Sequence, residues 1–126
     1  MSAKRLVLAA VITASVLLPP QELGAAVTIH GNNLFTDCTA TNTNVAKEQW
    51  LLIGTCLGYV TAIVDALSSG NSVNGFKACV PLNADMQQIV DVVKNFIRDY
   101  PEKRHLVAAG LVAEALARAF PCRPTR

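Results

Sequence analysis

The sequence predicts an all-α fold, a small disulfide-stapled bundle of about four helices that follows a cleaved signal peptide. Three observations support this prediction. Apolar residues recur at spacings of three and four along much of the chain. Four cysteines are widely spaced in a chain of 126 residues, which is enough for one domain. The first 26 residues show the basic, apolar and small-residue order of an export signal.

The predicted signal peptide covers residues 1–26. Lys4 and Arg5 form its basic start, and residues 6–18 are uncharged and mostly apolar. This apolar run is shorter than the roughly 20 residues that span a bilayer as a helix, so an uncleaved membrane anchor is the weaker alternative. Cleavage is expected after Ala26, with Ala25 as the alternative, which leaves residues 27–126 as the exported, periplasmic domain.

The charge of that domain argues against some classes of partner. Nine basic and eight acidic residues remain after residue 26, and the longest basic cluster is the short, mixed segment 102–105. A surface that binds nucleic acid or anionic lipid needs a concentrated positive patch. We therefore expect no nucleic-acid partner, and no membrane partner after cleavage.

The first two predicted helices lie on either side of the polar loop 39–44. The first begins at Asn32 or Asn33, either of which can serve as an N-cap, and reaches Cys38. The second runs from about Val45 to Leu67. Its apolar face recurs as one buried stripe requires, through Ile53, Leu57, Val60, Val64 and Leu67.

A stripe of small residues follows another side of the second helix, at Gly54, Gly58, Ala62 and Ala66. Small side chains allow a neighbouring backbone to approach closely, which would offset the helix-breaking cost of the two glycines, about 1 kcal/mol each. We therefore expect this helix to be central. Trp50 is interpreted either as an interface anchor or as a residue packed at the helix edge.

Residues 68–78 form the clearest loop, with Gly70, Asn74 and Gly75 supplying turn chemistry. A third helix is expected to start at Asp85 as N-cap, with Gln88 in a capping-box position, and to end before Pro101. The fourth is expected from about Glu102 to Ala119. The third helix should bury Met86, Ile89, Val90, Val93, Phe96, Ile97 and Tyr100, and the fourth Leu106, Leu111, Val112, Leu116 and Phe120.

The cysteines Cys38, Cys56, Cys79 and Cys122 predict two disulfides. Zinc sites usually contain closely spaced cysteine pairs, whereas the shortest spacing here is 18 positions, so no metal site is expected. The loop 68–78 is long enough to retrace half of the second helix, which favours Cys56–Cys79 and leaves Cys38–Cys122. The pairing Cys38–Cys56 with Cys79–Cys122 is also reachable.

The sequence offers no plausible catalytic site. The predicted mature domain has two histidines, His30 and His105, and its carboxylates are scattered without a recognisable motif. It also lacks a phosphate-binding glycine loop and a zinc-protease helix motif. A protein that is not an enzyme and needs no cofactor is therefore expected.

Several short motifs follow one another along the predicted mature domain. They are C-L-G-Y at 56–59 with D-A at 65–66, C-V-P at 79–81, Gln88 with V-V at 92–93, Y-P-E-K-R-H at 100–105, A-L at 115–116 and A-F-P-C at 119–122. Taken in this order, they resemble the Rap/Tai family of type VI secretion immunity proteins. The resemblance covers roughly residues 31–122. The sequence differs from the family at Ala62, where Gly is frequent, and at Asp85, where Thr is common.

The resemblance implies a periplasmic, helical and often dimeric protein that binds and inhibits a peptidoglycan amidase delivered by neighbouring cells. No catalytic residue is carried over. Our hypothesis for the inhibitory surface is the polar, flexible loop 68–78, with Asn71, Ser72 and Asn74 at its tip. A plain connecting loop is the alternative interpretation.

A different function also fits the sequence. Small periplasmic chaperones of the acid-stress type are likewise exported, helical and disulfide-bonded, and they expose apolar surface when a dimer dissociates near pH 2–3. An immunity domain without a surviving cognate toxin is a third possibility.

Overall fold

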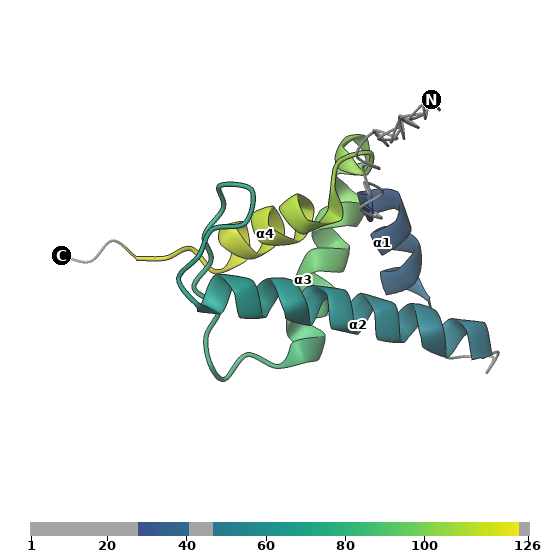
Figure 1. Ribbon diagram of the computed structural model, residues 1–126, viewed down its shortest axis with the longest axis horizontal. Helices are drawn as coiled ribbons and strands as arrows, with labels where there is room; N and C mark the ends of the chain where they lie inside the picture. The colour runs from purple at the N-terminus through teal and green to yellow at the C-terminus, as the bar shows by residue number, and fades with distance from the viewer. Residues whose placement is uncertain (1–27, 41–46, 124–126) are drawn as a thin grey trace, which may run out of the picture.

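A computed structural model describes residues 28–40 and 47–123, which form a helical domain (Figure 1). These residues contain no strand, only two isolated β-bridges. The predicted all-α, disulfide-stapled fold is confirmed. The predicted signal peptide, 1–26, lies outside the described residues. The elements are α1 (Gly31–Thr39), α2 (Lys47–Ser68), α3 (Met86–Asp99), the 3-10 turn η1 (Pro101–Lys103) and α4 (Ala108–Ala119).

Helix α4 is the most buried helix of the described domain, whereas the sequence favoured the second helix for the central place. Eight of the twelve residues of α4 are buried, and each of the four helices contacts the other three. Because half of these buried residues are Gly or Ala, neighbours can approach α4 from several sides. In contrast, α2 buries only Cys56, Val60 and Leu67. The buried residues of α4 are Ala108, Gly110, Leu111, Val112, Ala113, Glu114, Ala115 and Leu116.

The small-residue stripe of α2 does not pack within the described domain, which contradicts the close contact expected for it. Gly54, Gly58 and Ala62 are exposed, and a Cβ placed on either glycine would meet no atom within 4 Å. By length and composition α2 could cross a membrane, with a mean hydropathy of 1.7 over its most apolar window. Only 22% of that window is buried, so much of this apolar helix is uncovered in the single chain.

Helix α3 follows the prediction closely. Asp85 is its N-cap, and the carboxylate accepts a hydrogen bond of 2.8 Å from the backbone N–H of Gln87 rather than using Gln88 in a capping box. The predicted apolar face packs into the core. Ile89, Val90, Val93, Phe96 and Ile97 are buried, and Met86 and Tyr100 are partly buried against them.

The fourth helix begins at Ala108, six residues later than expected. Pro101 opens η1 instead, and the carbonyls of Arg104 and Leu106 accept hydrogen bonds of 2.9 Å from Asn32 and Gly31 of α1. These carbonyls therefore serve the contact with α1 rather than a continuous helix. Leu106, expected in the core, is consequently exposed.

Arg104 fixes this junction between α1 and α3. Its Nε donates a 2.8 Å hydrogen bond to the carbonyl of Ile97 near the end of α3, and its guanidinium lies 3.7 Å from the Phe35 ring centroid. The approach is so close that a Cβ on Gly31 would lie 2.9 Å from the Arg104 backbone. Glycine at position 31 is therefore required by space.

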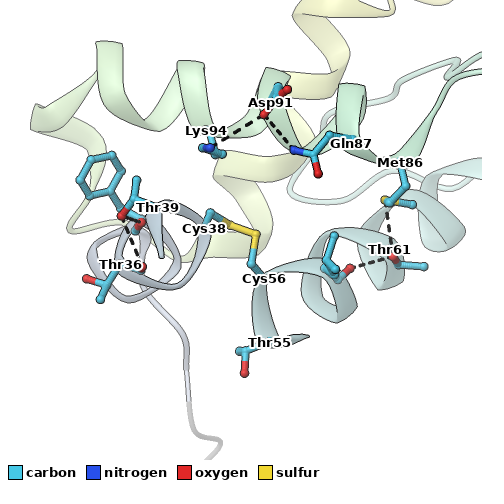
Figure 2. Close-up of a disulfide and its surroundings, with 12 residues drawn as sticks. Thr36, Cys38, Thr39, Thr55, Cys56, Thr61, Met86, Gln87, Asp91 and Lys94 are labelled. Carbon is cyan, nitrogen blue, oxygen red and sulfur yellow. Dashed lines mark hydrogen bonds and ion pairs between the residues drawn. A yellow bond between two sulfur atoms is a disulfide. The ribbon is translucent and has the colours of Figure 1, made fainter. Parts of the chain in front are cut away.

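The disulfides are Cys38–Cys56 and Cys79–Cys122, so the favoured pairing of Cys56 with Cys79 and of Cys38 with Cys122 was wrong. The expectation assumed that the loop after α2 runs back along that helix. Instead, the backbone N–H of Cys79 donates a 2.9 Å hydrogen bond to Phe120, at the end of α4, which places Cys79 beside Cys122. Figure 2 shows Cys56 joined instead to Cys38 at the end of α1.

The two bridges differ in exposure, which predicts the order of their reduction. Cys38 and Cys56 are 6% and 3% exposed, whereas Cys79 and Cys122 both lie at the surface. Thiol–disulfide exchange requires access of the attacking thiolate. We expect dithiothreitol to open Cys79–Cys122 first in the folded protein, as followed by thiol alkylation and mass spectrometry. Earlier alkylation of Cys38 and Cys56 would contradict this expectation.

Candidate functional site

The segment between α2 and α3 forms two loops at one end of the molecule, where residues 120–123 after α4 also lie (Figure 1). The first loop is a small hairpin. Val73 and Phe76 exchange two backbone hydrogen bonds of 3.0 Å, and Asn74 and Gly75 between them have φ values of 50° and 81°. A two-residue Asn-Gly turn with positive φ at both positions matches a hairpin's twist. The loop is therefore more ordered than the sequence suggested.

The hairpin rests on α4 through Asn74. A Cβ at Gly110 would lie 2.4 Å from the Asn74 side-chain nitrogen, so glycine leaves the space that Asn74 occupies. Asn71 and Ser72 precede the hairpin and are exposed. All three residues proposed for the loop tip are exposed, but they lie differently. Asn74 is in the turn and lies against Gly110 of α4, whereas Asn71 and Ser72 lie before the hairpin.

The second loop, residues 79–85, was not singled out from the sequence. Its centre is a turn in which the N–H of Ala84 donates a 3.0 Å hydrogen bond to the carbonyl of Pro81. Leu82 lies in this turn and is fully exposed. Its exposure could not be read from the sequence, because an isolated leucine near a helix start is equally compatible with the core.

A hollow of about 280 Å³ lies between the two loops. We call it the Leu82 hollow. Its wall includes the Cys79–Cys122 disulfide and the end of α2. Its lining residues are Leu67, Ser68, Gly70, Asn71, Lys77, Ala78, Cys79, Val80, Leu82 and Cys122.

A second hollow of similar volume lies between the hairpin and α4, with Glu114 in its lining. Glu114 is the buried charged residue of the described core, at 8% exposure. Its Oε1 accepts hydrogen bonds from Lys103 Nζ at 2.5 Å and from Arg118 Nη2 at 2.6 Å. Two cations therefore compensate one buried carboxylate.

Aromatic rings complete this cluster. Phe96 and Tyr100 stack with centroids 4.7 Å apart, and the cations of Lys103 and Arg118 lie within 5.5 Å of both ring centroids. Arg118 also donates a 3.0 Å hydrogen bond to the Tyr100 hydroxyl. The cluster joins η1, α3 and α4 and leaves the cations partly exposed.

The groups that could support catalysis are not gathered into a site. All four cysteines are disulfide-bonded, so none is a free thiol. His30 and His105 are exposed, and His30 caps α1. Within residues 28–40 and 47–123, no group of three or more His, Cys, Asp or Glu residues could hold a metal ion.

Glu114 predicts an acid-sensitive contribution to stability. Burial opposes ionisation of this carboxyl, but the hydrogen bonds and charges of Lys103 and Arg118 outweigh it and lower the pKa of Glu114. A lowered carboxyl pKa stabilises the fold above the ordinary carboxyl range, and this contribution is lost as the pH falls through the folded-state pKa. We expect Glu114→Gln to cost about 1–3 kcal/mol at pH 7 and to flatten the loss of stability towards pH 3.

Urea unfolding between pH 3 and pH 7 measures this effect. Glu102→Gln is the matched control because Glu102 is an exposed glutamate on the neighbouring turn. Equal pH profiles for Glu114→Gln and the unsubstituted protein would show that the buried ion pairs do not set the acid response.

No curated protein and no solved structure matches the chain. A family model described as Rap1a immunity proteins matches residues 30–122. That match extends from the N-cap of α1 to the last cysteine, which is almost the whole described domain. The chain therefore belongs to the family of Rap1a immunity proteins.

Proposed function

We propose that this chain is a periplasmic immunity protein that binds and inhibits a type VI secreted peptidoglycan amidase. The observation that carries the proposal is the family match over residues 30–122, since an immunity protein acts by binding a cognate toxin. We assign it no enzymatic activity and no cofactor, because inhibition by binding requires neither.

Two features support the periplasm as its location. Both cysteine pairs are oxidised, and disulfides persist in oxidising compartments such as the bacterial periplasm. The sequence of residues 1–26 has the order of an export signal. An inhibitor exported there would meet an amidase at its peptidoglycan substrate.

We also propose that the segment 68–78 contributes to the inhibitory surface. Asn71 and Ser72 are exposed beside a hollow and offer amide and hydroxyl groups for hydrogen bonds with an enzyme cleft. Asn74 contributes differently, because its contact with Gly110 holds the hairpin against α4. An ordered hairpin loses less conformational entropy on binding than a flexible loop.

The direct test is binding of the mature, oxidised domain to a panel of type VI peptidoglycan amidases. We expect tight binding to one member and loss of its peptidoglycan hydrolysis, measured by calorimetry and by release of cleaved peptide. No binding and no inhibition across the amidases would refute the amidase assignment.

Two variants then test the loop. The double substitution Asn71→Ala and Ser72→Ala should weaken binding about tenfold or more, since each lost charge-neutral hydrogen bond is worth about 0.5–1.5 kcal/mol. The control Asn74→Gly keeps a residue that tolerates positive φ and should change thermal stability more than affinity. Unchanged affinity in the double variant would show that residues 68–78 are only a connecting loop.

We further propose that the domain forms a homodimer through the N-terminal half of α2. Trp50 and Leu51 are 54% and 70% exposed there. Leu51, Gly54 and Gly58 follow the i, i+3, i+7 spacing of one helix face. The two glycines have no neighbour within 4 Å of a Cβ placed on them in the single chain, so they would let two copies of α2 approach closely. Burial of this apolar surface would drive association.

Leu51→Asp tests the dimer because it places a charge on the proposed interface. We expect light scattering after size-exclusion chromatography to give twice the monomer mass for the unsubstituted domain and the monomer mass for the variant. A monomeric unsubstituted domain would contradict the proposal. Dissociation near pH 2–3 with binding of an apolar dye would instead favour the acid-stress chaperone.

A further inference from the structure

We propose that Leu82 and the Leu82 hollow beside it form a docking surface for the effector. Leu82 is the anchor that enters an apolar pocket of the effector, and Lys77 meets a carboxylate at the rim of that pocket. This inference rests on the proposed immunity function and names a part of the contact that the hairpin residues do not include.

The first support is the exposure of Leu82. It is the most exposed of the large apolar side chains in the described residues, and it lies in a loop rather than on a helix face. A single exposed leucine is ordinary on a protein surface, so exposure alone would carry no conclusion. What distinguishes Leu82 is the way in which the chain holds it.

The backbone on both sides of Leu82 is restrained. Before it, Cys79 is bonded to Cys122, and its N–H donates to the carbonyl of Phe120 at 2.9 Å. At the turn, Pro81 has a restricted φ and accepts the hydrogen bond from Ala84. After it, Asp85 caps α3. Such a turn loses little conformational entropy when its side chain is buried by a partner.

The second support is the shape next to this leucine. The hollow of about 280 Å³ begins at Leu82 and continues to Leu67 at the end of α2. A protruding leucine beside a hollow can insert into a pocket of the partner, while a side chain of the partner fills the hollow. Energetically important contacts in protein interfaces concentrate in such desolvated pockets, with polar groups around them. Here Ser68 and Asn71 supply polar groups in the lining.

The charge of this surface indicates the chemistry of the partner. Among the described residues that line the hollow, Lys77 alone is charged, and the exposed Arg123 directly follows Cys122. A complementary surface is therefore apolar at its centre and acidic at its edge. Opposite charges of this kind increase the association rate and favour the correct partner.

A second copy of the chain is a less suitable occupant than an effector. The uncovered apolar half of α2 begins at Trp50, whereas the Leu82 hollow lies at the other end of the helix, next to Leu67. Sixteen residues separate Leu51 from Leu67, which is about 24 Å along a helix. The two surfaces can therefore be occupied at the same time, one by a second copy and the other by an effector.

The experiment compares Leu82→Ala with Leu106→Ala in the mature, oxidised domain. Both variants remove the same side chain from an exposed position, and Leu106 does not line the Leu82 hollow. The probes are purified type VI effectors, both peptidoglycan amidases and effectors of other activities, with affinity measured by calorimetry or biolayer interferometry. We expect Leu82→Ala to bind the preferred effector about tenfold more weakly or worse, with an unchanged melting temperature, and Leu106→Ala to bind within about twofold of the unsubstituted domain.

Charge is tested separately with Lys77→Ala. We expect slower association and a smaller dependence of the association rate on salt, because electrostatic steering is screened by ions. An equal salt dependence of the association rate in this variant and the unsubstituted domain would show that Lys77 takes no part in the contact.

The outcomes separate this inference from the proposed function. Amidase binding that Leu82→Ala leaves unchanged would overturn the docking surface and support the amidase assignment. Binding to an effector of another activity, lost in Leu82→Ala, would support the docking surface and overturn the amidase assignment. If the unsubstituted domain binds no effector in the panel, both proposals are overturned.

Discussion

The burial of α4 is the constraint on which the rest of the domain depends. A helix enclosed by three others and a loop must present small side chains on several sides, and α4 does so with Ala108, Gly110, Ala113 and Ala115. Its one charged residue at low exposure, Glu114, is tolerated because Lys103 and Arg118 both contact it. A buried carboxylate without such partners would be strongly destabilising. The cations come from η1 and from α4 itself, so the same pairs also hold the turn before α4 in place.

Backbone hydrogen bonds near the two ends of α4 position its neighbours. At its start, α1 uses backbone hydrogen bonds to Arg104 and Leu106 and leaves no room for a side chain on Gly31. At its end, Phe120 accepts a hydrogen bond from Cys79. Each disulfide then fixes one of these arrangements, Cys38–Cys56 between α1 and α2 and Cys79–Cys122 between the loops and the end of the chain. Helix α2 also contacts the other three helices, yet much of its apolar surface is uncovered in the single chain.

The sequence predicted the elements better than their arrangement. Periodicity located α3 and its buried face because an amphipathic helix repeats its burial every three to four residues. For α4 it found the helix and the buried Leu111, Val112 and Leu116, but not the late start at Ala108. It also missed the small residues of α4, which are buried on several sides and so give no clear stripe. The glycines of α2 were interpreted as sites where a neighbouring backbone packs closely, but the sequence does not indicate whether that neighbour belongs to the same chain or to another. The cysteine pairing failed for a related reason. It depended on the path of the loop after α2, and that path is set by the contact between Asn74 and Gly110 and by the hydrogen bond from Cys79 to Phe120.

The candidate site was less predictable than the fold. Asn71 and Ser72 were identified by turn composition, whereas Leu82 carries no signal in the sequence, because exposure of an apolar residue is a property of the folded chain. The Cys79–Cys122 bridge joins the segment that presents these residues to the chain after α4, so the bond that stabilises this end of the fold also restricts its motion. An inhibitor benefits from that restriction, since a surface already held in its bound shape loses little entropy on association. In the proposed contact, stability and effector binding would depend on the same covalent link at this end of the domain, whereas the buried Cys38–Cys56 bridge serves the helical core.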